Sequence, residues 1–353
     1  MQVSEKEPRN ETATGRARRV LVFVCDGTLS STEVGRRSNA GRLAALLAEA
    51  GHPEQLVRYH PGIQGGGMVR WVNAALGRTI DCGIADGYEF LSRHWKPGDV
   101  IGLFGYSRGA YAVRSLAGLI GRLGLLRPEA TTPERVETAM AHYRGRLGAR
   151  RDAVDAAAVF SGAFCQSRVP IEVLGVWDTV RALGLPVPWL QHLMPDEMRF
   201  HDDALGPHIR HGYHALAHDE DRVLFEPVLW QRSAHWAGRL EQCWFPGGHG
   251  DVGGEIRGEP QARGLSNIAL NWMLRRAESH GLHLPEDWES RFPEDPLAPS
   301  SSGRTLMSRL YWRGPARDVG LGDGEVLHLS LRTRAIGRSE ESAQPTLDGL
   351  PAQ

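Results

Sequence analysis

The stretch DVIGLFGYSRGAY, residues 99–111, decides the fold. Its apolar first half indicates a buried strand, and the segment 110–122 indicates the amphipathic helix that follows. Between them lies a Gly-X-Ser-X-Gly pattern, in which Ser107 has Gly105 two residues before it and Gly109 two residues after it. A serine on so tight a strand-to-helix turn has its hydroxyl held above the edge of a parallel sheet, and only small residues fit at the flanking positions. We therefore predict a nucleophile elbow at Ser107.

The pattern by itself is a weak signal, because a chain with 42 glycines can contain it by chance. Its setting is more specific. A Pro-Gly-Asp turn at 97–99 precedes the apolar run. The helix after Ser107 would direct its N-terminal N–H groups and the positive end of its dipole at the site. This order favours a functional interpretation over coincidence.

Three more apolar runs end in turns that carry polar residues. Continuous apolar runs suit strands buried in a parallel sheet, and helical segments separate them along the chain. We therefore predict an α/β fold: an α/β-hydrolase-like, mostly parallel, doubly wound sheet with helices on both faces and loop-rich insertions. Ligands bind such sheets at the carboxyl ends of the strands. The runs and turns are Val20–Cys25 with Asp26–Gly27–Thr28, Ile171–Trp177 with Asp178–Thr179, and Glu241–Phe245 with Gly248–His249.

The remaining periodicity predicts the other elements. Asn39 is expected to cap a helix that runs to Leu47, and Ser266 to cap a helix over 265–280. A proline-rich loop at 186–194 is a candidate cover for the site. Further helices are expected over 68–76, 84–93, 133–146, 153–160 and 211–221, and further strands over 55–59 and 326–331.

Ser107, Asp178 and His249 follow three of the predicted strands, in that order along the chain. A serine hydroxyl is a poor nucleophile near neutral pH and needs a base. Histidine has a suitable pKa, and a carboxylate fixes its tautomer and stabilises the imidazolium. α/β-Hydrolases supply these groups in the order serine, acid, histidine. We therefore predict that Ser107 is the nucleophile, His249 the base and Asp178 the orienting acid.

Other interpretations of these residues remain open. Asp178 can equally be a turn or capping aspartate, and His249 a loop histidine. The chain has 15 histidines, so the base has rivals. His214 and His218 lie near acidic residues but in an expected helix, and His328 is a more distant choice.

The loops beside the elbow carry the remaining candidates. An oxyanion hole needs two N–H donors. One is expected from Arg108, directly after the nucleophile, and the other from Gly27 or Thr28 in the loop after the first strand. Asp26 then either holds this loop or organises the site, and we favour the structural role. Asp251 is a second candidate for the orienting acid, although it lies only two residues from the histidine.

The composition bounds the function. The chain has 353 residues, 41% of them hydrophobic and 24% charged, with a formal net charge of −1. This charge gives no field that would recruit nucleic acid, and no apolar run is long enough for an integral membrane segment. The four cysteines are too scattered for a zinc site or a disulfide framework.

The chain is expected to form one catalytic domain over 19–336, with a disordered N-terminal tail over 1–18 and a flexible C-terminal tail over 337–353. The N-terminal stretch lacks the apolar segment of a signal peptide, so we expect a cytoplasmic location. Secretion that needs no cleaved signal stays open, and the sequence indicates no particular protein partner.

Five ordered segments together resemble one family, the α/β-hydrolases of type VI secretion lipase effectors, which have phospholipase activity. The resemblance implies a Ser-Asp-His hydrolase with Ser107, Asp178 and His249 in the family's motifs. Tyr106 stands where the family usually has phenylalanine, and we do not expect these residues to form the extra membrane-associating region of the large secreted effectors. The segments are VFVCDGT (22–28), GDVIGLFGYSRGAYAVRSLAGLI (98–120), GVWDTVRALG (175–184), HALAHDEDRVLFEPVLW (214–230) and FPGGHGDVGG (245–254).

The predicted function is a serine hydrolase that cleaves a carboxylic ester through an acyl-enzyme, in the manner of a lipase, phospholipase or esterase. Its substrate is a small-molecule or lipid ester, and it needs no metal or organic cofactor. The alternatives are an acyltransferase or thioesterase in small-molecule biosynthesis, and a non-catalytic binding domain. A haloacid-dehalogenase-type phosphatase is disfavoured, because its nucleophilic aspartate would stand two residues before Asp26, where the chain has Val24.

Overall fold

The computed structural model describes residues 18–27, 37–62, 78–144, 150–180, 204–233, 236–256, 259–301, 314 and 317–343. The helix expected over 68–76, the loop at 186–194 and Thr28 lie outside these ranges.

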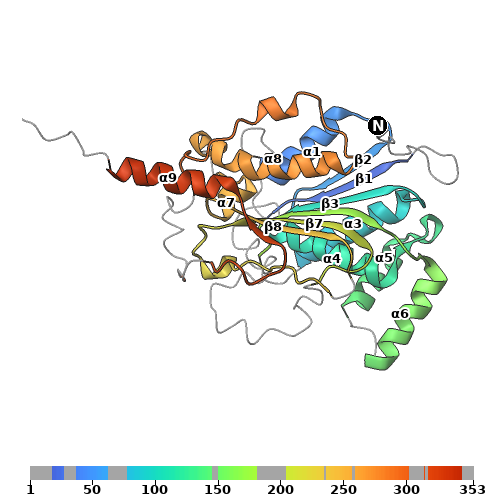
Figure 1. Cartoon of the computed structure of the whole chain (residues 1–353). Coiled ribbons are helices and arrows are strands. Elements are labelled where there is room, and N and C mark those ends of the chain that lie inside the picture. Colours follow the sequence, from blue (N-terminus) through green and yellow to red (C-terminus); the bar gives the residue numbers. More distant parts are fainter. Residues whose placement is uncertain are drawn as a thin grey trace, which may run out of the picture.

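A seven-stranded sheet forms the centre of the described part of the chain (Figure 1). Its order is β2-β1-β3-β6-β7-β8-β9, and every neighbouring pair is parallel. The strands are β1 (Val20–Cys25), β2 (Gln55–His60), β3 (Val100–Tyr106), β6 (Ile171–Trp177), β7 (Ile209–Ala217), β8 (Arg239–Phe245) and β9 (Glu325–Leu327). A separate antiparallel pair joins β4 (Leu125–Leu126) to β5 (Cys165–Gln166).

Helices cover both faces of the sheet, as Figure 1 shows with α1 and α8 on one side and α4, α5 and α6 on the other. The predicted doubly wound α/β fold is therefore confirmed. The helices are α1 (Asn39–Ala50), α3 (Arg78–His94), α4 (Arg108–Leu123), α5 (Pro133–Tyr143), α6 (Arg150–Phe164), α7 (His249–Gly253), α8 (Arg263–Ser279) and α9 (Leu329–Ala343). Short 3-10 turns are η2 (Pro128–Ala130), η5 (Val223–Phe225), η6 (Pro260–Ala262) and η7 (Trp288–Arg291).

The first strand explains why its sequence is apolar without alternation. Leu21 and Phe23 pack into the core under α3 and α4, whereas Val22 and Val24 pack into the core under α1 and α8. Successive side chains of a strand point to opposite faces, so a strand covered on both faces buries every residue.

The strand register brings the loops together at one edge. Tyr106, the last residue of β3, lies beside Trp177, the last residue of β6. Ala217 and Phe245, the last residues of β7 and β8, are likewise partners. Because these neighbouring strands end level, the turns that follow them meet above the carboxyl edge of the sheet.

One expected helix is a strand. Residues 209–217 form β7 in the middle of the sheet, not a helix over 211–221. The polar side chains of His211 and His214 interrupt the apolar run that marks the other strands, and a short mixed segment has no decisive period. His214 is nevertheless fully buried, because both faces of β7 are covered.

The helix boundaries differ from expectation at two N-termini. Ser38, and not Asn39, caps α1, and its hydroxyl accepts a hydrogen bond from Gly41 N–H. Ser266 lies inside α8, which begins at Arg263, and its hydroxyl donates to the Asn39 side chain. Asn39 and Ser266 therefore join α1 to α8 instead of capping a helix.

The C-terminal segment is more ordered than expected. Residues 325–327 form the edge strand β9, and α9 then runs from Leu329 to Ala343. The expected strand over 326–331 is thus only partly correct, and the tail expected from residue 337 begins inside a helix. The helices expected over 84–93, 133–146, 153–160 and 265–280 are confirmed in substance.

The four cysteines are free thiols, and three of them are buried. In the part of the chain that the structure describes, every helix is too short or too polar to cross a bilayer.

Candidate active site

Ser107 occupies the turn between β3 and α4 with the backbone of a nucleophile elbow. Its φ is 57° and its ψ −119°, a conformation that non-glycine residues rarely adopt. The turn is too tight for side chains beside it: a Cβ at Gly105 would lie 2.5 Å from the Gly109 carbonyl oxygen, and one at Gly109 would lie 2.2 Å from the Cys25 carbonyl oxygen. The flanking glycines are therefore steric requirements, as the sequence predicts.

The structure brings Ser107, His249 and Asp178 together in one chain of hydrogen bonds. His249 begins α7, directly after the loop that follows β8, and its Nε2 lies 2.9 Å from Ser107 Oγ. Its Nδ1 lies 2.6 Å from Asp178 Oδ2. All three side chains are buried. The spacing allows His249 to accept the serine proton while the aspartate holds the other nitrogen protonated.

Asp178 also has partners other than His249. It follows β6 in a strained turn with a φ of 40°. Its Oδ1 accepts a hydrogen bond from Ala217 N–H at 3.0 Å. The guanidinium of Arg317 donates to both carboxylate oxygens, at 2.6 Å and 3.0 Å. Sequence reasoning missed Arg317, because nothing near residue 317 marks it as a partner of a residue 139 positions earlier.

The charges of this site follow from burial and from these partners. Burial would raise the pKa of Asp178, but the guanidinium of Arg317 and the His249 hydrogen bond outweigh it and hold that pKa well below its usual range. Burial lowers the pKa of His249 and outweighs the opposite effect of Asp178. The aspartate is therefore charged and the histidine neutral near neutral pH, which are the states that general-base catalysis requires.

The loop after β7 holds the histidine loop in place. Glu220, whose carboxylate pairs with Arg222, accepts a hydrogen bond from His249 N–H at 3.0 Å. The imidazole contacts two aromatic rings, with its centroid 4.9 Å from that of Tyr106 and 4.7 Å from that of Phe225. These contacts restrict the ring to the orientation that reaches both partners.

The two acids considered beside the site have other roles in this structure. Asp251 accepts hydrogen bonds from Gly248 N–H, Ser300 and Ser301, so it fixes the histidine loop to a later segment. Asp26 accepts from Gly27 N–H, Ser38 and Tyr59, as a structural turn carboxylate does. This agrees with the role we favoured for Asp26.

The predicted oxyanion donors are only partly placed. Arg108 begins α4 directly after Ser107, where a backbone N–H would face a developing oxyanion. The N–H of Gly27 donates to Asp26 Oδ1 at 2.7 Å. Thr28, the alternative second donor, lies outside the described residues, so both assignments stay predictions.

The rival histidines are engaged elsewhere. His214 accepts from Thr179 N–H and contacts Gln242, and burial lowers its pKa to about 3. His218 pairs with Asp219 at the surface. His328 contacts Ser330.

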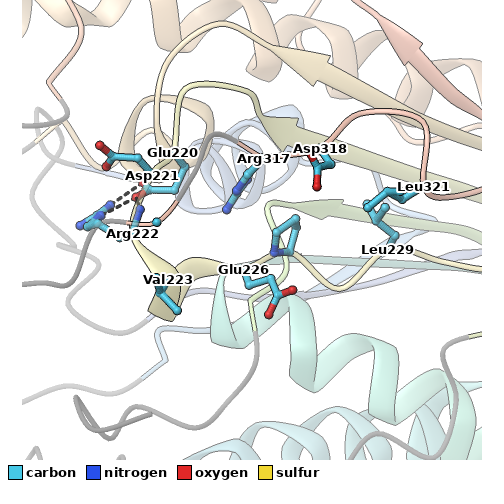
Figure 2. Close-up of a pocket in the computed structure, with 11 residues that line it drawn as sticks. Glu220, Asp221, Arg222, Val223, Glu226, Leu229, Arg317, Asp318 and Leu321 are labelled. Carbon is cyan, nitrogen blue, oxygen red and sulfur yellow. Dashed lines mark hydrogen bonds and ion pairs between the residues drawn. The ribbon is translucent and has the colours of Figure 1, made fainter.

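A cavity of about 300 Å³ lies on the Arg317 side of the site. Figure 2 shows Arg317 in its wall between Glu220 and Asp318, with Leu229 and Leu321 close together at one end. Neither Ser107 nor Asp178 lines this cavity, and Arg317 is the residue that connects it to the acid.

One group of described residues has the composition of a metal site. Ligand atoms of Glu172, His211 and His280 lie within 4.8 Å of one another, near the amino ends of β6 and β7. The two imidazoles are stacked with centroids 4.0 Å apart, and Arg210 already pairs with Glu172. The Tyr213 hydroxyl lies 2.9 Å from Nε2 of His280, so protein side chains already engage both the carboxylate and one of the imidazoles of this cluster. It also lies at the opposite end of the strands from Ser107.

The elbow, the level strand ends and the Ser107–His249–Asp178 arrangement define the architecture of an α/β-hydrolase. The family model for the catalytic domain of Tle1-like phospholipase effectors of the type VI secretion system matches residues 19–276. The chain belongs to this family. The resemblance drawn from the five sequence segments is thus confirmed, and the family indicates a lipase- or esterase-like hydrolase.

Individual relatives match more partially. An uncharacterized Saccharomyces cerevisiae protein, YEL023C, is 32% identical over 134 residues, which are 34% of this chain and 19% of the yeast protein. An uncharacterized Pseudomonas aeruginosa protein of known structure is 19% identical with a TM-score of 0.45, over 80% of this chain and 50% of that one. A Tle1 effector bound to the VgrG spike is 16% identical with a TM-score of 0.35, over 73% of this chain and 57% of that one. The chain thus spans about half of these solved relatives and 19% of the yeast protein.

Proposed function

We propose that the protein is a serine hydrolase that cleaves a carboxylic ester through an acyl-enzyme. The observation that carries this proposal is the hydrogen-bond chain from Ser107 Oγ through His249 to Asp178. In that chain the nucleophile has a neutral base at 2.9 Å, and the base has a buried carboxylate behind it.

In the proposed reaction, Ser107 Oγ attacks the ester carbonyl while His249 Nε2 takes the hydroxyl proton. The tetrahedral oxyanion forms beside the N-terminus of α4, where the N–H of Arg108 is our proposed donor. His249 returns the proton to the leaving alcohol as the ester C–O bond breaks. Water then attacks the acyl-enzyme with His249 again as base, which releases the carboxylic acid and restores Ser107.

We propose a phospholipid or a related lipid ester as the substrate, because the family is one of phospholipase effectors. We also propose that the chain binds a secretion spike protein, as the Tle1 effector does in the structure of its complex with the VgrG spike. A cytoplasmic location is likewise our proposal, and cell fractionation would test it.

The first experiment compares wild type and Ser107→Ala on acyl esters, acyl thioesters and phospholipid vesicles, with fluorophosphonate labelling of Ser107 in parallel. We expect hydrolysis of one ester class by wild type and its loss in the variant. Faster product formation with an added alcohol or amine acceptor would indicate acyl transfer instead. A folded wild type that neither turns over nor labels would contradict the proposed function and favour a binding domain.

A further inference from the structure

Arg317 is a buried cation bound to the acid of the proposed site. Its side chain is 6% exposed and that of Asp178 is 0% exposed. The guanidinium meets the carboxylate in a two-pronged pair, with one nitrogen on each oxygen. Such a bidentate pair fixes the orientation of the carboxylate in addition to balancing its charge.

Two backbone carbonyl groups also accept hydrogen bonds from the Arg317 guanidinium. The guanidinium donates to the carbonyl oxygen of Ala217 at 2.7 Å and to that of Phe225. Ala217 is the last residue of β7 and Phe225 the last residue of η5. The segment that follows β7 therefore fixes the position of the Arg317 guanidinium. Arg317 itself comes from beyond residue 276, where the family match ends.

The aspartate needs a counter-charge when the site is at rest. Burying a charged carboxylate away from water costs folding free energy unless the carboxylate is paired with a cation and hydrogen-bonded. His249 is neutral in the resting state and becomes a cation only during proton transfer. Among the described contacts of Asp178, the Ala217 N–H and the His249 ring are neutral donors, and Arg317 supplies the charge.

We infer that Arg317 is a positioning residue of the proposed hydrolase: it holds the Asp178 carboxylate in place and keeps His249 a neutral base at lower pH than the aspartate alone would allow. This inference rests on the proposed function. An arginine never deprotonates in this range, so its charge opposes that of Asp178 at every working pH. Without it, the full field of the aspartate acts on the imidazole and raises its pKa.

Other groups around the imidazole also shift the pKa of His249. Burial and the cation of Arg222 lower its pKa, whereas Asp178 and Glu220 raise it. These charges stay in place when only Arg317 is changed. The ionisable or charged side chains that face or neighbour the ring are Asp178 after β6, Glu220 and Arg222 after β7, Tyr106 and Ser107 at the end of β3, and Asp251 in its own helix.

The test is an NMR titration of the His249 imidazole in wild type, Arg317→Met and Arg317→Lys, with His249→Gln to assign the signal. We expect Arg317→Met to raise the pKa of His249 by about one unit. Arg317→Lys should give a smaller rise, because lysine keeps the charge and loses the two-pronged geometry. Should the methionine variant fail to fold, the lysine variant still tests the sign. Arg210→Met is the matched control, since it removes an arginine–carboxylate pair at the far end of β7.

The kinetic arm measures the rate of fluorophosphonate labelling of Ser107 against pH. We expect the acid limb of Arg317→Met to move up with the pKa of His249, and the plateau rate to fall about tenfold because the acid is no longer fixed. An unchanged His249 pKa in a folded Arg317→Met or Arg317→Lys protein overturns the inference. Absence of labelling in wild type contradicts the proposed function instead, whatever the titration shows, so the two failures are distinguishable.

Discussion

His214 and His249 are two buried histidines near the same edge of the sheet, and their partners differ. Both nitrogens of His214 face amide groups that do not ionise, the Thr179 N–H and the Gln242 side chain. His249 has a hydroxyl on one nitrogen and a carboxylate on the other. Burial alone therefore does not make a base. The candidate catalytic histidine differs by having a charged carboxylate on Nδ1 and a serine hydroxyl on Nε2.

The largest expected difference is in turnover. His249→Ala should reduce ester hydrolysis and Ser107 labelling at least about 10⁴-fold, because the serine loses its base. His214→Gln should stay within about tenfold of wild type, because His214 does not touch the nucleophile. Initial rates on the ester identified by the substrate panel measure both. Equal losses in the two variants, with both folded by circular dichroism, would break the comparison.

The carboxylate behind His249 is expected to have the next largest effect. Asp178→Asn should lower kcat about 10³- to 10⁴-fold, since an amide no longer fixes the reactive tautomer or stabilises the imidazolium. Gln242→Asn, the corresponding change behind His214, should leave kcat within severalfold. Steady-state kinetics of the two variants test this. An Asp178→Asn enzyme with near wild-type kcat would mean that Asp178 only builds the turn.

The pH dependence of activity should follow His249 and not His214. The pKa of His249 is lowered from its usual 6.5, so the neutral base persists below that pH. Activity should be above half of its plateau at pH 6.5 and fall about tenfold per pH unit once the pH is well below the lowered pKa. A kcat/KM profile measures this limb. A midpoint above pH 6.5 would show that Asp178 dominates over burial.

The smallest predicted effect concerns stability in acid. The pKa of His214 is about 3 in the folded chain against 6.5 for an ordinary histidine. Between these values the unfolded chain binds a proton that the folded chain does not, so stability falls as pH falls, by about 1.4 kcal/mol per unit from this residue. Urea unfolding of wild type and His214→Gln between pH 6.5 and 4.5 measures the difference. Parallel pH slopes in the two proteins would show that His214 is not held neutral.

The sequence predicts the sheet best where one rule governs a whole segment. Val20–Cys25 and Ile171–Trp177 are strands with the expected bounds, because burial on both faces favours a continuous apolar run, which only the half-buried Glu172 near the start of β6 interrupts. The pattern of residues 211–221 instead predicts a helix, because the polar side chains of His211 and His214 interrupt the apolar run of β7. Their burial depends on partners such as Gln242, which local sequence does not display.

The candidate site also contains residues that the local sequence predicts and one that it does not. Ser107, Asp178 and His249 could be proposed because each follows a recognisable strand, and parallel strands deliver their turns to one edge. Arg317 could not, because its role depends on how a distant C-terminal segment packs against the end of β7. Polar contacts between remote segments are a tertiary outcome, whereas turns after strands are a local one.

The backbone at Ser107 and Asp178 has a consequence for how this enzyme would change under selection. Both residues have a positive φ, at 57° and 40°, where glycine is the least strained residue. Serine and aspartate at these positions thus store strain of order 1–3 kcal/mol each in the folded state. A chain selected for thermal resistance alone would gain by replacing Ser107 with glycine, whereas the same change at Asp178 would leave the buried guanidinium of Arg317 without its carboxylate. We therefore expect a melting-temperature screen without an activity screen to erase the proposed chemistry first.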